Sequence, residues 1–127
     1  MQTRQTVTVI GGGASGLLTA IQIISQGGRS GPRVYLIEKQ EPFGFGAAYS
    51  TNDPCHLLNT RAGNMSGFPD KPKHFVDWLQ ANSEGSSKRA TPSCFVSRRT
   101  YGRYLRSLLC DAVTGADAAG RFLHRAR

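Results

Sequence analysis

Apolar residues over the first forty positions follow two different periods. Residues 6–10, TVTVI, are β-branched at almost every position without clean polar alternation, which predicts a strand covered on both faces, as in a parallel sheet. A stripe spaced i, i+3, i+4 and i+7 then predicts a helix over 14–26, with the members Leu17, Ala20, Ile21 and Ile24. Gly27 and Gly28 end that helix, and a second strand is predicted at 34–37. The order predicts a βαβ unit of an α/β fold.

The middle of the chain shows little periodicity. Residues 40–74 contain many glycines and prolines, which interrupt regular structure. They also carry too many large apolar side chains for a solvated linker, namely Phe43, Phe45, Tyr49, Leu57, Leu58, Met65 and Phe68. A loop of this length inside a domain is usually functional. We therefore expect an ordered coil that packs against a large, flat surface.

Two further helices are predicted in the second half of the chain. The first runs from about residue 73 to 81, and Trp78 on its apolar face is expected to anchor the core. After a polar surface loop, Ser97 is predicted to cap a helix over 98–112. The apolar stripe of that helix consists of Tyr101, Tyr104, Leu105, Leu108 and Leu109. The tail, residues 114–127, contains a glycine turn and the first residues of another predicted strand.

Three glycines connect the first strand to the first helix with the spacing G-x-G-x-x-G. In such a turn Gly11 permits the tight bend, Gly13 lets a pyrophosphate approach the backbone, and Gly16 lets the helix pack close to the strand. The helix N-terminus offers unpaired N–H groups and a partial positive charge to the phosphates. Glu38 ends the second strand, 22 residues after Gly16, where an acid can accept hydrogen bonds from an adenosine ribose. The alternative is a βαβ unit whose glycines serve only the turn.

Composition and charge narrow the class of protein. A chain of 127 residues with 39% hydrophobic content can bury the core of one domain. No run is apolar enough to span a bilayer, and the N-terminus leads directly into the first strand without a signal peptide, so we expect a cytoplasmic protein. The net charge of +8 divides into +2 over residues 1–64 and +6 over residues 65–127. Because the basic residues are scattered between helices, a solvated surface is favoured over nucleic-acid binding.

The cysteines and histidines give no metal or redox pattern. Cys55, Cys94 and Cys110 contain no C-x-x-C, and they are predicted to be reduced, buried thiols. His56, His74 and His124 lack metal-ligand spacing and are expected to be surface or structural residues. A disulfide reductase would need a redox pair of cysteines, so that subclass is disfavoured.

Several segments together resemble a known family. VTVIGGGASG, LIEK, GFGAAYS, LLNTRAGNMSGF, FVDWL and FVSRRTYGRYL are similar to the N-terminal region of the bacterial FAD-NAD(P)-binding proteins, relatives of flavin-dependent oxidoreductases and flavin monooxygenases. The similarity spans residues 7 to about 109. The glycine motif is shared by many dinucleotide enzymes, whereas GAAYS with LLN and the RRTYGRYL helix are much more specific.

The resemblance implies an enzyme with two dinucleotides: FAD on this Rossmann-like unit and NAD(P)H on a later one. The residues that would face the FAD pyrophosphate belong to the glycine turn; they are Gly11, Gly12, Gly13, Ala14, Ser15 and Gly16. Glu38 would hold the adenosine ribose with Lys39 beside it, and the GAAYS and LLNTRAGNM segments would lie towards the flavin. A bound flavin would provide the flat surface expected beside residues 40–74; packing against a missing remainder of the protein explains the same residues.

The chain departs from the family in its length. Family members run to several hundred residues, and no second glycine fingerprint follows Gly16, so no NAD(P)H site is visible. We therefore expect residues 1–127 to be the N-terminal part of a FAD/NAD(P)-binding domain, an incomplete domain whose partner is the missing remainder of an enzyme. The catalytic residues are not identified. The alternatives are a non-catalytic dinucleotide-binding module or remnant and, less favoured, a methyltransferase, whose turn usually lacks the third glycine.

Overall fold

The computed structural model describes residues 3–39, 49, 51–82, 89–118 and 122–126. Its elements in chain order are β1 (Thr6–Ile10), α1 (Ala14–Gly27), the 3-10 helix η1 (Gly28–Ser30), β2 (Arg33–Glu38), the 3-10 helix η2 (Ala62–Asn64), α3 (His74–Asn82), α4 (Arg98–Ala118) and β3 (Phe122–Ala126). The predicted helices are confirmed with ends shifted by one residue, except that α4 continues six residues beyond the predicted end at 112.

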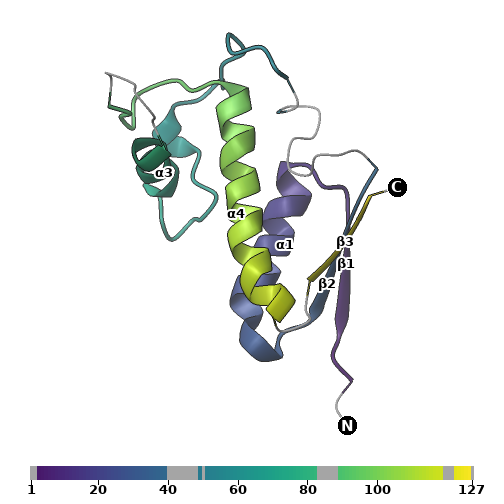
Figure 1. Ribbon diagram of the computed structural model, residues 1–127. Coiled ribbons are helices and arrows are strands. Elements are labelled where there is room, and N and C mark those ends of the chain that lie inside the picture. Colours follow the sequence, from purple (N-terminus) through teal and green to yellow (C-terminus); the bar gives the residue numbers. More distant parts are fainter. Residues whose placement is uncertain (1–2, 40–48, 50, 83–88, 119–121, 127) are drawn as a thin grey trace.

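The three strands form one parallel sheet in the order β1-β2-β3 (Figure 1). β1 pairs with β2 in a register that places Val7 beside Val34 and Ile10 beside Ile37. β2 also pairs with β3, which places Val34 beside Phe122. The α/β class and the βαβ unit are therefore confirmed, and the predicted strand in the tail is β3. The strand order is that of one half of a doubly wound sheet.

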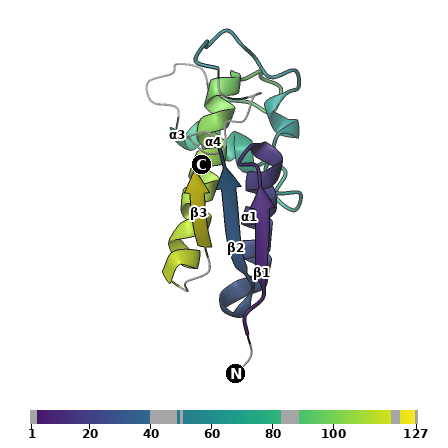
Figure 2. The same ribbon diagram turned by 90° about the vertical axis from the view of Figure 1, so that its right-hand side faces the viewer.

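Both long helices cover the same face of the sheet. Figure 1 shows α1 and α4 side by side on one side of the strands, and Figure 2 shows the strands in front of both helices. The face opposite α1 is therefore not the one that α4 covers. The chain passes from β1 to β2 and from β2 to β3 in one direction, and right-handed crossovers then place both connecting helices on one side.

The exposure of β1 follows from this arrangement. Its residues alternate between exposed and half-buried, and Ile10 is 83% exposed. Val9 lies on the covered face, where it packs with Ala20, Ile24, Val34 and Leu36. Within the described part of the chain, the prediction of a strand covered on both faces is therefore wrong.

A second core lies between α4, α3 and the segment before α3. Buried Leu58 and Ala62 pack there with Phe75 of α3 and Tyr104 of α4, and Met65 and Phe68 are partly buried against them. Tyr49, Leu58, Met65 and Phe68 therefore find partners in this chain, which corrects the expectation that such partners lie outside it, whereas Leu57 stays 51% exposed. Phe43 and Phe45 lie outside the described residues.

Hydrogen bonds along two extended segments hold this second core together. The N–H of Leu58 donates to Val96 O at 2.8 Å, and the N–H of Ala62 donates to Cys94 O at 2.9 Å. Ser97 caps α4 as predicted, because its Oγ accepts the N–H of Thr100 at 3.1 Å. The segment 56–63 is thereby fixed against the chain that leads into α4.

Tyr104 is the centre of the second core. Its fully buried ring lies 4.6 Å from that of Phe75 and 5.4 Å from that of Trp78, measured between centroids. Its hydroxyl lies 2.8 Å from Nδ1 of His74 and accepts the N–H of Gly67 at 3.1 Å. His74 is therefore structural, as predicted, and Trp78 contacts the core as predicted.

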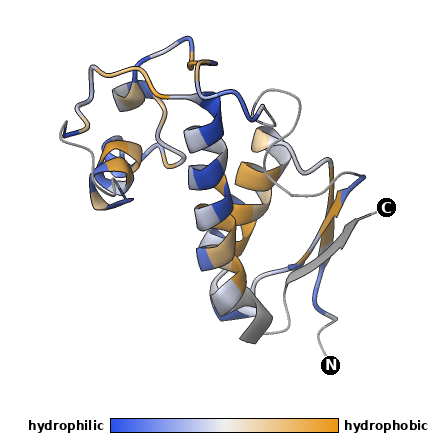
Figure 3. Ribbon diagram, turned by 45° about the horizontal axis from the view of Figure 1, so that its top comes forward, coloured by the Kyte–Doolittle hydropathy of each residue, from blue (hydrophilic) through white to orange (hydrophobic). Residues whose placement is uncertain are grey.

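The described surface is polar along the outward turns of α4 (Figure 3). Arg99, Arg103 and Arg106 are exposed there. Cys55 and Cys110 are also exposed, so the prediction that the thiols are buried is wrong for these two, while Cys94 is half-buried and all three are free. Among the described residues, no helix has the length and apolarity needed to cross a membrane.

Candidate functional site

The glycine turn begins where β1 ends, at the carboxyl edge of the sheet. The N–H of Gly11 donates to the carbonyl oxygen of Ile37 at 2.7 Å, which extends the pairing of the strands by one residue. Gly11 then takes φ +100°, in the left-handed region that side chains disfavour. The predicted need for glycine at the tight bend is confirmed.

Gly16 makes the closest approach in the site. A Cβ at this position would overlap the carbonyl oxygen of Gly11, lie 3.0 Å from the carbonyl carbon and lie 3.4 Å from Cγ1 of Val9. The first turn of α1 therefore rests directly on the glycine turn and on β1. This is the close packing of helix and strand that the spacing predicts.

The first N–H groups of α1 lack hydrogen-bond acceptors among the described residues. Gly13 is the N-cap, and its carbonyl oxygen accepts the N–H of Leu17 at 2.9 Å. The geometry of an α-helix leaves the N–H groups of Ala14, Ser15 and Gly16 without intrahelical acceptors, and no side chain caps them within the described residues. Because the first turn contains no acidic residue, the helix end presents donors and a partial positive charge suited to an anion.

Glu38 reaches from the end of β2 to the glycine turn. Its Oε2 accepts the N–H of Gly12 at 2.6 Å, and its Oε1 accepts the N–H of Lys39 at 2.7 Å. The carboxylate is thus fixed beside the N-terminus of α1, whereas Lys39 is exposed. The structure brings all of the sequence-predicted site residues together at one edge of the sheet.

The bond between Gly12 and Glu38 is the feature that sequence reasoning missed. The motif placed Gly12 among the cofactor contacts, but its N–H is directed to a carboxylate of the protein itself. The signal available was the parallel register, because β1 and β2 end side by side and the residues that follow them must meet.

The structure describes only part of the segments that were expected near a flavin. Of GAAYS, only Tyr49 belongs to the described residues, and its ring lies 5.0 Å from that of Tyr101 between centroids. In LLNTRAGNM, Leu58 and Ala62 are buried in the second core, whereas Leu57 is 51% exposed. Their proximity to a flavin stays a prediction.

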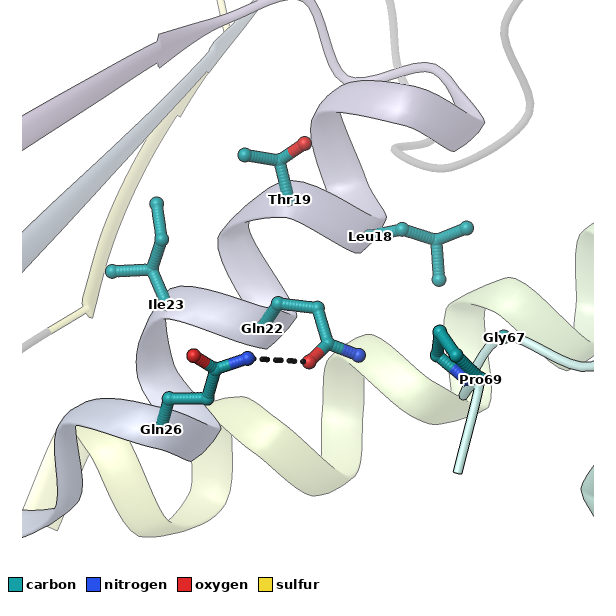
Figure 4. A pocket seen from close by; sticks show the side chains of 7 residues that line it. All are labelled: Leu18, Thr19, Gln22, Ile23, Gln26, Gly67 and Pro69. Atoms are coloured by element: carbon teal, nitrogen blue, oxygen red, sulfur yellow. Dashed lines mark hydrogen bonds between the residues drawn. The ribbon is translucent and has the colours of Figure 1, made fainter. Parts of the chain in front are cut away.

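A separate open pocket of about 420 Å³ lies on the outer side of α1 (Figure 4). None of the residues of the glycine turn lines it. Gln22 and Gln26 stand at its wall, joined by a hydrogen bond of 3.3 Å, and Gly67 and Pro69 close the opposite side. None of the described residues that line it is ionisable. Among the described residues, no group of His, Cys, Asp and Glu is arranged to hold a metal ion.

Comparison with known proteins agrees with this geometry. The model of the FAD-NAD(P)-binding family matches residues 8–127, which include the whole glycine turn, Glu38 and the helices α1, α3 and α4. No curated protein matches the sequence. Because the match covers nearly the entire chain, the protein belongs to the FAD-NAD(P)-binding family, and its ligand is a dinucleotide.

Proposed function

We propose that this chain binds FAD and forms the FAD-binding segment of a flavin-dependent oxidoreductase that uses NAD(P)H. The observation that supports FAD binding most strongly is the uncommitted N-terminus of α1 beside the carboxylate of Glu38. In this proposal the N–H groups of Ala14, Ser15 and Gly16 bind the pyrophosphate, and Glu38 accepts the hydroxyls of the adenosine ribose. When bound, the flavin supplies the hydride and electron chemistry.

The residues present fit the adenosine diphosphate half of the cofactor. Gly13 has extended backbone angles, φ −71° and ψ −175°, and stands at the mouth of the helix, where a phosphate would approach. A phosphate at Glu38 would be repelled by the negative charge of the carboxylate, so that position suits a ribose hydroxyl. The phosphates would instead bind at the N-terminus of α1, which carries a partial positive charge. This arrangement distinguishes the two ends of the binding site by charge.

The proposal is tested by titrating the 127-residue chain with FAD, followed by flavin fluorescence, with ADP and NAD⁺ as competitors. We expect ADP to compete with FAD and FAD to bind more tightly than NAD⁺. Gly13→Val should raise the Kd for FAD at least about tenfold, since a side chain would occupy the path of the pyrophosphate. The matched control is Gly115→Val, because a Cβ at Gly115 on α4 meets no atom within 4 Å. Equal affinity of the Gly13→Val variant and the parent would contradict the proposal.

We further propose that catalysis needs protein beyond these residues. Ile10 is 83% exposed on the face of the sheet that α1 and α4 do not cover. Within the described chain, no strand pairs with the outer edge of β1. A doubly wound domain adds its second half at that edge. We therefore expect weak FAD retention by the 127-residue chain during gel filtration and no oxidation of NADPH. A monomer that stays yellow and consumes NADPH would show that the chain is sufficient; a colourless chain with no affinity for FAD or ADP would favour the non-catalytic remnant.

A further inference from the structure

Two successive backbone amides of the glycine turn are bonded to the end of β2. Gly11 donates to the carbonyl oxygen of Ile37 at 2.7 Å, and Gly12 donates to Oε2 of Glu38 at 2.6 Å. We propose that Glu38 is a positioning residue, which holds the turn in its binding shape before a nucleotide arrives. This role rests on the proposed function and is separate from the contact of Glu38 with the ribose.

Within the described part of the chain, few other hydrogen bonds hold the turn. Glycine backbones lose more conformational freedom on ordering than any other residue, and three follow one another here, Gly11 to Gly13. Their carboxyl end is fixed by Leu17, whose N–H donates to Gly13 O. Among the described residues, Glu38 provides the only side-chain hydrogen bond to the three glycines. The orientation of the Gly12 peptide therefore depends on that carboxylate.

The side chain of Glu38 is itself fixed by a second hydrogen bond. Its second oxygen accepts the N–H of Lys39 at 2.7 Å, so the carboxylate bridges the end of its own strand and the turn. Hydrogen bonds from neutral amides to a carboxylate are short and stronger than those between neutral groups. A carboxylate offers about four lone-pair positions, and the two backbone donors bind different oxygens of Glu38.

The functional consequence is preorganisation. If the turn were loose without nucleotide, ordering it would subtract from the binding free energy. With Glu38 in place, the turn is already shaped when the pyrophosphate reaches the N-terminus of α1. The side chain then contributes to the affinity for phosphates that it does not touch.

Amide hydrogen exchange on the 127-residue chain without nucleotide tests this directly. We expect Glu38→Ala to speed exchange of the Gly12 amide at least about tenfold, because the amide loses a hydrogen bond to a charged acceptor. Glu38→Gln should keep much of the protection, because its side-chain oxygen can still accept the proton. Exchange at Leu36, buried in β2, should not change in either variant. The control Asp70→Ala removes an exposed carboxylate away from the turn and should leave both amides unchanged.

Two outcomes of the exchange experiment would overturn the proposal. The first is unchanged exchange at Gly12 in Glu38→Ala, which would show that the bond does not order the turn. The second is an equal rise at Gly12 and Leu36, which would show that Glu38 stabilises the sheet as a whole and does not act on the turn.

A pair of ligands separates the positioning role from the ribose contact. ADP and 2′,3′-dideoxy-ADP share the pyrophosphate, but the second lacks the ribose hydroxyls. Positioning predicts that Glu38→Ala weakens binding of the dideoxy ligand by at least about fivefold. A loss confined to ADP would overturn positioning and leave the ribose contact intact. If the parent binds neither ligand, the proposed function fails, and the exchange experiment decides the positioning role by itself.

Discussion

Gly16 of α1 rests on the backbone carbonyl of Gly11, so closely that a Cβ at position 16 would overlap the carbonyl oxygen. Backbone atoms cannot move aside as a flexible side chain can, so Gly16→Ala must push α1 away from β1. We expect a loss of about 1–3 kcal/mol in the free energy of unfolding, the range for overpacked sites. Urea unfolding followed by circular dichroism measures it.

The matched substitution Gly115→Ala serves as the control for that experiment. Gly115 lies in α4, where a Cβ meets no atom within 4 Å. Alanine favours the helix there by up to about 1 kcal/mol, so this variant should be as stable as the parent or more stable. A Gly16→Ala variant that is also stabilised would contradict the close packing.

The two faces of β1 should respond differently to the same change. Val9 packs against the core under α1, whereas its neighbour Ile10 is 83% exposed. Val9→Thr turns a hydroxyl towards that core and should cost about 1 kcal/mol or more. Ile10→Thr should change the free energy of unfolding by no more than about 0.5 kcal/mol. Equal losses in urea unfolding would indicate that both faces are covered in solution.

The hydroxyl of Tyr104 should contribute to the free energy of unfolding in addition to the packing of its ring. Tyr104→Phe removes the acceptor of the Gly67 N–H and the partner of His74 Nδ1 while it keeps the ring. Leaving a buried donor unsatisfied costs about 1–3 kcal/mol. Tyr35→Phe is the control, because Tyr35 is half-buried and no hydrogen bond of its hydroxyl occurs among the described residues. Thermal melts that shift equally in both variants would show that the network adds nothing.

Tyr101 gives the second core a dependence on alkaline pH. Burial, with smaller effects of Tyr49 and Tyr104, raises the pKa of the Tyr101 phenol above its ordinary value. The unfolded chain therefore releases this proton above about pH 10, where the folded chain keeps it. The stabilisation that comes from this raised pKa is complete below about pH 10. As the pH rises further, the free energy of unfolding falls by at most about 1.4 kcal/mol per pH unit.

Tyr101→Phe removes this titration. We expect the variant to gain stability relative to the parent as the pH is raised from about 8 to about 11. Urea midpoints at several pH values measure the difference, and the comparison cancels the titration of lysines common to both proteins. Parallel curves for the two proteins would exclude the effect.

Much of the candidate site could be read from local spacing. The bend at Gly11 and the contact of Gly16 with the turn follow from three glycines between a β-branched run and an apolar helical stripe. The position of Glu38 beside the turn follows from the same order of elements. The bond that Glu38 makes to Gly12 could not be read in this way, since it depends on side-chain reach across two neighbouring strand ends.

The sequence by itself determined the βαβ unit, the glycine turn and where the helices α1, α3 and α4 begin, because these depend on periodicity and on backbone freedom within a few residues. Only the tertiary structure decided which face each helix covers and where the apolar residues before α3 are buried. The position of β3 beyond β2 puts α4 on the same side as α1, which leaves Ile10 exposed. Likewise, Leu58 joins Tyr104 through contacts between residues far apart in the chain, which no local pattern encodes.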